Sequence, residues 1–171
     1  MKELTNAIRI HAYGGPEVLQ MDEVPIAYPG PGEVRLRHTA IGVNFADIHT
    51  RNGRYPLPEL PASIGSEGAG VVEAIGDGVD FVSIGDRVAY SSGGHALPRG
   101  SYCEARTMAA DRLITLPDNI DDATAAAMTT KGLTAHYLIH DVYAVGPGDT
   151  IAVHAAAGGV GQIICQWSRH K

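Results

Sequence analysis

The chain has 171 residues, of which 44% are hydrophobic and 19% charged, and this composition is typical of a globular protein with a buried core. Its formal net charge is -6 and its Lys and Arg residues are scattered, which argues against nucleic acid as the main partner. No apolar run approaches the roughly 20 residues that cross a bilayer, and the N-terminus lacks a signal-peptide pattern, so we expect a cytoplasmic protein that does not enter the membrane.

Short β-rich runs separated by turn residues fill the chain from Ala7 to Leu116. They predict strands over residues 7–11, 18–24, 33–41, 71–75 and 87–90. Alternate residues of the run 33–41 are apolar except His38, which we interpret as a hydrogen-bonded core histidine rather than a ligand. Several short strands at this spacing indicate a closed or nearly closed barrel.

The pattern changes after Pro117. Asp121 and Asp122 can cap a helix through residues 123–128, and a second helix is expected over residues 131–143. The compact apolar run Thr150–His154 then favours a buried parallel strand, and helical spacing of apolar residues follows it. This order indicates the beginning of a doubly wound α/β unit. We therefore expect two domains, residues 1–122 and 123–171, with the second one incomplete.

A glycine-rich turn separates the last predicted strand from the last helix. It reads Ala156-Ala157-Gly158-Gly159-Val160-Gly161, which is the dinucleotide-binding fingerprint with alanine at its first glycine position. Backbone N–H groups at such a turn bind the pyrophosphate of a dinucleotide. The alternative is a turn that only lets the helix pack closely on its strand. The residue that distinguishes NAD from NADP would lie about 20 residues further on, beyond this chain.

Cysteine and histidine residues give little sign of a metal site. Cys103 and Cys165 have no CxxC partner, and we expect both to be buried, reduced thiols. His136 and His140 are four residues apart and could meet on one helix face, but the residues between them suggest an ordinary amphipathic helix.

Six segments in the right order resemble the zinc-independent quinone oxidoreductases of the medium-chain dehydrogenase/reductase superfamily. They are Gly14–Leu19, Ala40–Asp47, Gly65–Val72, Gly85–Val88, Lys131–Ala135 and His154–Gly161. The resemblance implies a mixed α+β protein in which a GroES-like β-barrel catalytic domain precedes a Rossmann-like doubly wound cofactor domain. It also implies NADPH as the cofactor, a homodimer for the full-length protein, and a chain that normally continues for about as long again.

The resemblance also bears on zinc. Zinc-dependent members of the superfamily bind the metal through two cysteines and a histidine, and the matching positions here, by approximate alignment, are Asn44, Ser66 and Ala127. None of these side chains is a good zinc ligand, so no metal is expected.

The resemblance suggests site residues as well, each with a structural alternative. Asn44 and Tyr55 are the expected catalytic residues, although Asn44 could simply cap the short helix 45–51 and Tyr55 could simply pack. Asn44, Lys131 and Thr134 are expected to contact the cofactor together with residues 156–161, although Lys131 could be a solvated helix-end residue.

The function implied is NADPH-dependent reduction of a quinone without catalytic zinc. A quinone is an activated acceptor, so positioning of the cofactor and hydrogen bonds to the developing oxyanion would suffice for hydride transfer. Two alternatives stay open: reduction of the activated double bond of an enone or enal, and a truncated, non-catalytic GroES-like binding or interaction module.

Overall fold

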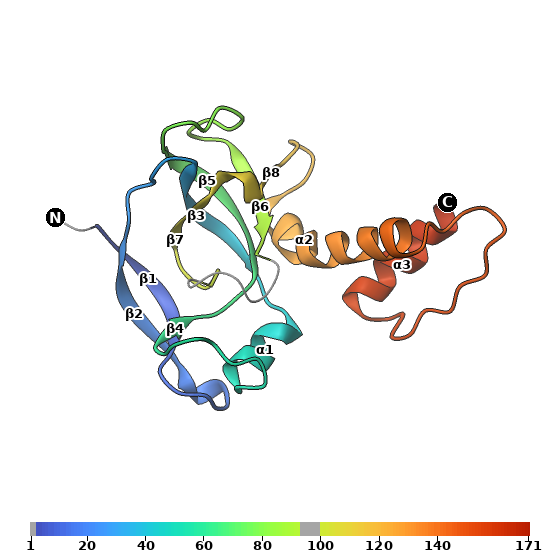
Figure 1. Cartoon of the computed structure of the whole chain (residues 1–171), viewed down its shortest axis with the longest axis horizontal. Coiled ribbons are helices and arrows are strands. Elements are labelled where there is room, and N and C mark those ends of the chain that lie inside the picture. The colour runs from blue at the N-terminus through green and yellow to red at the C-terminus, as the bar shows by residue number, and fades with distance from the viewer. Residues whose placement is uncertain (1–2, 93–99) are drawn as a thin grey trace. The chain divides into compact units, whose positions relative to one another are not determined.

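The computed structural model describes residues 3–92 and 100–171. The chain divides into two compact units, Met1–Ala127 and Met128–Lys171, which we take in turn (Figure 1). Among the described helices, none combines the length and the apolar character that a membrane span requires. The domain limits predicted from the sequence, 1–122 and 123–171, stay a prediction.

Two antiparallel sheets build the first unit. The smaller sheet has the order β2-β1-β4, from strands Leu19–Ile26, Glu3–Ile10 and Ala62–Ser63. The larger has the order β7-β3-β5-β6-β8, from strands Ala105–Ala109, Glu33–Gly42, Glu67–Ile75, Arg87–Ser91 and Leu113–Thr115. Single 3-10 turns, η1 (Pro16–Val18) and η2 (Ala110–Arg112), precede β2 and β8. The five predicted strands are all present, with ends that differ by a few residues.

The core of this unit follows the alternation read in β3. Val34 and Leu36 are fully buried, whereas Arg37 and Thr39 on the opposite face are exposed. Side chains from β5, β6 and β7, from the loop between β5 and β6 and from η2 complete the cluster: Val72, Val82, Val88, Tyr90, Met108 and Ala110. Apolar residues at every second position of β3 therefore pack inward, as the sequence predicts.

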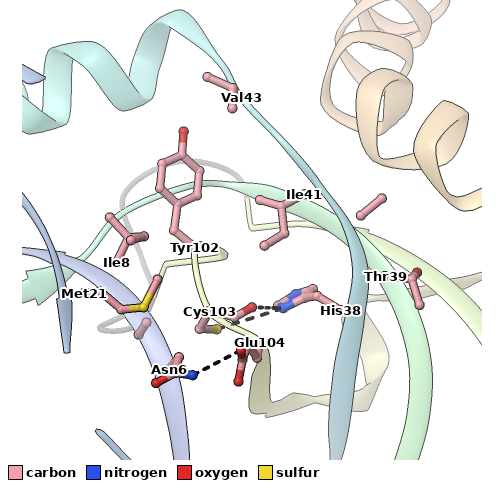
Figure 2. A pocket seen from close by; sticks show the side chains of 12 residues that line it. Asn6, Ile8, Met21, His38, Thr39, Ile41, Val43, Tyr102, Cys103 and Glu104 are labelled. Carbon is pink, nitrogen blue, oxygen red and sulfur yellow. Dashed lines mark hydrogen bonds between the residues drawn. The ribbon is translucent and has the colours of Figure 1, made fainter. Parts of the chain in front are cut away.

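A short segment before β7 links the two sheets. Ile8 N–H donates to the carbonyl of Tyr102 at 2.7 Å, and Glu104 N–H donates to the carbonyl of Asn6 at 2.9 Å. Asn6 Nδ2 also donates to the Glu104 carboxylate at 3.1 Å (Figure 2). These bonds join β1 to the chain that leads into the larger sheet.

His38, on β3, is a hydrogen-bonded core residue, as predicted. Its Nδ1 lies 2.7 Å from the carbonyl of Cys103, and its Nε2 lies 2.8 Å from the Tyr90 hydroxyl. The pKa of His38 is lowered to about 4, mainly by burial; the hydrogen bond with the Cys103 carbonyl raises it and the charge of Arg106 lowers it, both to a smaller extent. The imidazole is therefore neutral near pH 7.

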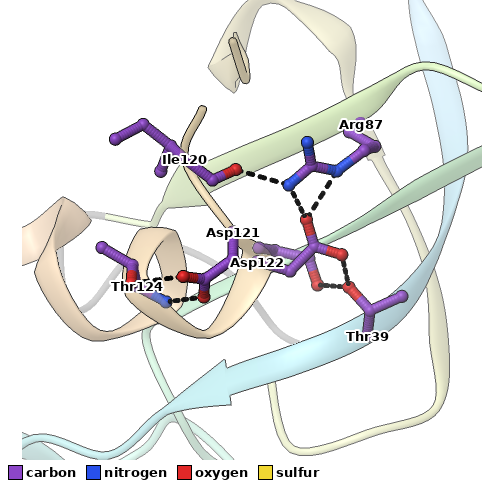
Figure 3. A network of polar contacts seen from close by, with 7 residues as sticks. Thr39, Arg87, Ile120, Asp121, Asp122 and Thr124 are labelled. Atoms are coloured by element: carbon purple, nitrogen blue, oxygen red, sulfur yellow. Dashed lines mark hydrogen bonds and ion pairs between the residues drawn. The ribbon is translucent and has the colours of Figure 1, made fainter. Parts of the chain in front are cut away.

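Helix α2 (Asp122–His136) begins where the sequence predicts, and two aspartates explain why. The Asp121 carboxylate accepts the Thr124 backbone N–H at 2.8 Å, which is an N-cap bond. Asp122 accepts two bonds from Arg87 of β6, at 2.9 and 2.6 Å, and one from the Thr39 hydroxyl at 2.6 Å (Figure 3). The first turn of α2 is thus tied to two strands of the larger sheet.

The second unit differs from the sequence prediction in two places. Residues 122–136 form one α-helix that runs without a break into a π-helix, η3 (Tyr137–Val142). The segments predicted at 123–128 and 131–143 are therefore helical, apart from Tyr143, but the break expected between them is wrong. No proline interrupts this stretch, and Gly132 is tolerated within the helix.

The predicted strand Thr150–His154 is also wrong, because these residues have no strand structure. A parallel strand exists only through hydrogen bonds to a neighbouring strand, and the second unit, all of which the structure describes, contains none.

Helix α3 (Gly159–His170) confirms the helical spacing predicted at the end of the chain. Val160, Ile164 and Trp167 lie along its more buried face. Cys165 falls off that face and is exposed, whereas Cys103 is buried. The expectation of two buried thiols therefore holds for Cys103 and is wrong for Cys165.

Candidate active site

Asn44 lies between β3 and helix α1 (Phe45–Arg51), and it caps that helix. Its backbone N–H donates to Asp47 Oδ2 at 2.8 Å, and Asp47 N–H donates to the Asn44 carbonyl at 3.0 Å. Together the two residues form a capping box. The structural alternative for Asn44 is therefore present in the fold, and it involves Asp47 as the reciprocal partner.

The side chain of Asn44 makes a second set of contacts, with the beginning of β5. Its Nδ2 donates to Glu67 Oε1 at 2.8 Å and to Ser66 Oγ at 3.3 Å. An amide nitrogen carries two N–H groups, so both have protein acceptors here. Glu67 has no exposed surface at all, which places an acidic group in the interior beside Asn44.

Asp47 is a second buried acid in the same network, with 5% of its surface exposed. Besides the Asn44 N–H, its Oδ2 accepts the hydroxyl of Tyr102 at 3.1 Å. Burial raises the pKa of Asp47, and the charge of Glu67 raises it further, while hydrogen bonds from Asn44, Tyr102 and Ser66 oppose the rise. Burial and the neighbouring Asp47 likewise raise the pKa of Tyr102.

Gly42 is what makes room for the Glu67 side chain. A Cβ on this glycine would lie 2.5 Å from Glu67 Cγ and 2.3 Å from the carbonyl oxygen of Ala126. Both distances are well inside van der Waals contact. Glycine is thus required at this position by close approach, not by its backbone angles.

The three positions that match zinc ligands behave differently in the structure. Asn44 and Ser66 bond to each other, while Ala127 lies exposed on α2 with only a methyl group. Over the described residues, no group of three or more His, Cys, Asp or Glu side chains is arranged to hold a metal ion. His136 and His140 do meet on one helix face, as expected, with stacked rings 4.5 Å apart and Trp167 packed against both.

Tyr55 belongs to a row of aromatic rings beside α1. Its ring packs edge-on against His49 at 5.2 Å between centroids, and His49 packs against Phe45 at 6.1 Å. Tyr55 N–H donates to the His49 carbonyl at 3.0 Å, which fixes the loop that carries it. The structure therefore places Tyr55 against helix α1, which Asn44 caps.

Tyr102 is also one of the residues that line a cavity of about 440 Å³. Figure 2 shows the Tyr102 ring with the apolar side chains of Ile8, Met21 and Ile41 that line the same cavity. Tyr102 is thus shared between this cavity and the network around Asn44.

In the second unit, the glycine-rich turn leads into α3. Gly158 is the N-cap, and its N–H donates to the carbonyl of Ala155 at 2.8 Å, inside the turn. A Cβ on Gly161 would lie 2.4 Å from that same carbonyl oxygen, so the glycine allows close packing of turn and helix. Ala155 has a positive φ of 53°, which is uncommon outside glycine and concentrates at functional sites.

Close packing explains Gly161, but it leaves the first N–H groups of the helix for another role. The amides of Gly159, Val160 and Gly161 belong to the first turn of α3, where N–H groups have no partner within the helix. Such groups bind anions together with the helix dipole. A cavity of about 700 Å³ borders residues 158–161.

Lys131 lies beside this turn, since its Cδ is 2.7 Å from the place a Cβ on Gly159 would occupy. Two of the predicted cofactor-binding segments are therefore neighbours within the second unit. The Thr134 hydroxyl instead donates to the carbonyl of Thr130, one helical turn earlier, at 2.7 Å. Ala156 and Ala157 lie in the turn itself, where the Ala157 carbonyl accepts the Gln162 side chain at 2.6 Å.

Three residues of the network had no role in the sequence interpretation: Asp47, Glu67 and Tyr102. For Asp47 a signal was available, because the spacing from Asn44 is that of a capping box. Glu67 and Tyr102 follow Asn44 by 23 and 58 residues, and no local pattern brings them to it. Only the pairing of β3 with β5 and the path of the chain before β7 do so.

Two antiparallel sheets with a polar network at one helix N-terminus, followed by a helix and a glycine-rich turn, define the class. This is a GroES-like domain followed by a second, helical unit that carries the glycine-rich turn, in a mixed α and β architecture. Residues 30–147 match the family described as Alcohol dehydrogenase GroES-like domain. The chain therefore belongs to that family.

Similar proteins agree with this class. Quinone oxidoreductase of Pseudomonas aeruginosa is 50% identical over 166 residues, which are 97% of this chain and 50% of that protein. 2-Haloacrylate reductase of a Burkholderia species is 45% identical, over 94% of this chain and 49% of its own. The structure of Escherichia coli quinone oxidoreductase complexed with NADPH has a TM-score of 0.86 at 40% identity, covering 96% and 49%. The chain spans about half the length of the relatives it matches.

Proposed function

We propose that this chain is the catalytic domain and the beginning of the cofactor domain of an NADPH-dependent quinone reductase that works without catalytic zinc. One observation carries the proposal: the Asn44 amide is bonded to Ser66 and Glu67 where a zinc-dependent relative would present metal ligands. A site whose polar groups are already satisfied by one another gains little from a metal. The names of the most similar relatives support the same activity.

The residues of the second unit fit a dinucleotide. Gly159, Val160 and Gly161 would hold the pyrophosphate through backbone N–H groups, and Lys131 beside Gly159 would add a positive charge. NADPH, when bound, would supply the hydride for the reduction. The tasks of this chain's own residues would be to orient the reactants and to stabilise the charge that develops on the quinone oxygen. Asn44 is the candidate for orientation, because its two N–H groups are bound to Ser66 and Glu67 and its amide oxygen can accept a hydrogen bond, and the Tyr55 hydroxyl is the candidate for stabilising the charge.

The test uses the complete product of the gene, because this chain spans half of its relatives. NADPH oxidation with 1,4-naphthoquinone would be followed before and after exhaustive treatment with a zinc chelator. We expect the two rates to agree within about twofold, since no step needs a Lewis acid. Loss of the rate on chelation, with recovery on adding zinc, would contradict the proposal.

A second candidate function is reduction of an activated carbon–carbon double bond. The 45% identity to 2-haloacrylate reductase favours it, and the same cofactor and oxyanion-stabilising groups would serve an enone or enal. Rates with a naphthoquinone and with a 2-haloacrylate, compared at equal NADPH, separate the two. A third possibility, a non-catalytic binding module, predicts no saturable NADPH binding by the chain.

Three further properties of the whole protein stay predictions: the homodimer, the cytoplasmic location and the domain limits at residues 122 and 123. Size-exclusion chromatography with light scattering on the complete gene product would test the first. A dimer mass is the expected result.

A further inference from the structure

We propose that Glu67, Asp47 and Tyr102 are positioning residues, which hold the Asn44 amide in a single orientation for the reduction. The inference rests on the proposed function, since it gives Asn44 a part in the reaction. None of the three is expected to touch substrate or cofactor; each acts through Asn44.

The network holds Asn44 from two sides. Glu67 accepts the side-chain Nδ2 at 2.8 Å, and Asp47 accepts the backbone N–H at 2.8 Å. Tyr102 donates to the same Asp47 oxygen at 3.1 Å and so keeps that carboxylate turned toward Asn44. A hydrogen bond to a carboxylate is shorter and stronger than one between neutral groups.

The two ends of an asparagine amide are nearly equal in shape, so its orientation depends on the partners that surround it. A glutamate carboxylate can only accept hydrogen bonds, and it therefore selects the nitrogen end of Asn44. Replacing it by glutamine removes this selection without changing the shape of the side chain.

Burying Asp47 and Glu67 in one network costs free energy of folding, because each acidic group loses its contact with water and repels the other. A helix of seven residues does not need this arrangement, since an exposed N-cap serves as well, as Asp121 does on α2. The contact between Glu67 and Asn44 also requires glycine at position 42, because a larger residue there would overlap the Glu67 side chain.

The orientation can be measured directly on the 171-residue chain, without reference to activity. In a ¹⁵N-labelled sample, the side-chain NH₂ signals of Asn44, assigned with Asn44→Ala, would be compared between the wild type and Glu67→Gln. We expect Glu67→Gln to move these signals upfield or to split them into two sets, as the hydrogen bond to a carboxylate is lost. Unchanged Asn44 signals would overturn the proposal.

The chain offers a matched control. Asn6 Nδ2 also donates to a glutamate, Glu104, at 3.1 Å, but that pair is on the surface. Glu104→Gln should leave the Asn44 signals and the kinetic constants as they are.

Kinetics on the complete gene product then test whether the orientation matters. We expect Glu67→Gln to lower kcat about tenfold while the KM values stay within about twofold, because orientation affects the transition state more than binding. In the Asn44→Ala background the same substitution should change kcat by less than about twofold, since effects that act through one residue are not additive. Equal loss of kcat in both backgrounds would mean a general structural effect and would overturn the proposal.

Tyr102→Phe is the second variant, in case Glu67→Gln does not fold. It removes one hydroxyl and keeps the ring, and we expect a smaller loss of kcat that again disappears when Asn44 is alanine. If the wild-type protein had no quinone reductase activity, the proposed function would be contradicted. The NMR comparison would still decide whether Glu67 orients the Asn44 amide, because it does not depend on activity.

Discussion

His38 should make the stability of the first unit depend on pH. Its imidazole is bonded to the Cys103 carbonyl and the Tyr90 hydroxyl, and burial lowers its pKa to about 4 from an ordinary value of 6.5. Between these two values the unfolded chain binds a proton that the folded chain does not. The stability contributed by the neutral ring is therefore complete above pH 6.5 and is lost as the pH falls toward 4.

The size of the effect follows from the same two values. Each unit of difference between folded and unfolded pKa corresponds to about 1.4 kcal/mol, so the full loss is about 3 kcal/mol, of which about 2 kcal/mol appears between pH 7.5 and pH 5. His38→Gln keeps a donor and an acceptor but cannot titrate. We expect this variant to be less stable than the wild type at pH 7.5 and to lose about 2 kcal/mol less on acidification.

Urea unfolding followed by far-UV circular dichroism at pH 7.5 and pH 5.0 measures both quantities. The exposed His154 provides the control, since His154→Gln should retain the wild-type pH dependence. If wild type and His38→Gln lost the same free energy between the two pH values, the argument from burial would be wrong.

Two further predictions concern close packing and thiol exposure. Gly42→Ala should lower the free energy of unfolding by about 2 kcal/mol or more, because the new Cβ would overlap the Glu67 side chain. Thermal unfolding of the wild type and the variant measures this difference, and an unchanged midpoint temperature would contradict the prediction. With a thiol reagent such as dithionitrobenzoate, Cys165 should react at once in the native chain and Cys103 only after denaturation, so two fast thiols in native buffer would disagree with the structure.

Local patterns allowed part of the fold to be predicted from the sequence. Alternation in β3 correctly places Val34 and Leu36 inside, and the acidic pair at 121–122 correctly begins α2. These features depend on contacts between residues a few positions apart, so the sequence carries them directly. The glycine-rich turn and the helix that follows it are predictable for the same reason.

The strand predicted at 150–154 fails for the opposite reason. Its apolar residues suit a buried strand, but a strand also needs a hydrogen-bonded neighbour, and no sequence pattern within the run supplies one. The exposure of Cys165 likewise depends on which face of α3 meets the rest of its unit.

The candidate site divides in the same way. Asn44 and its capping partner Asp47 are three residues apart, and the sequence alone places them at a helix start. Glu67 reaches Asn44 only because β3 pairs with β5, and Tyr102 reaches Asp47 only because the chain before β7 pairs with β1. The sequence by itself therefore determined the class of fold and the position of Asn44 at the start of α1, while its part in a reaction stays a proposal. The buried acids that surround this residue were decided by tertiary structure, since long-range strand pairing has no local signature.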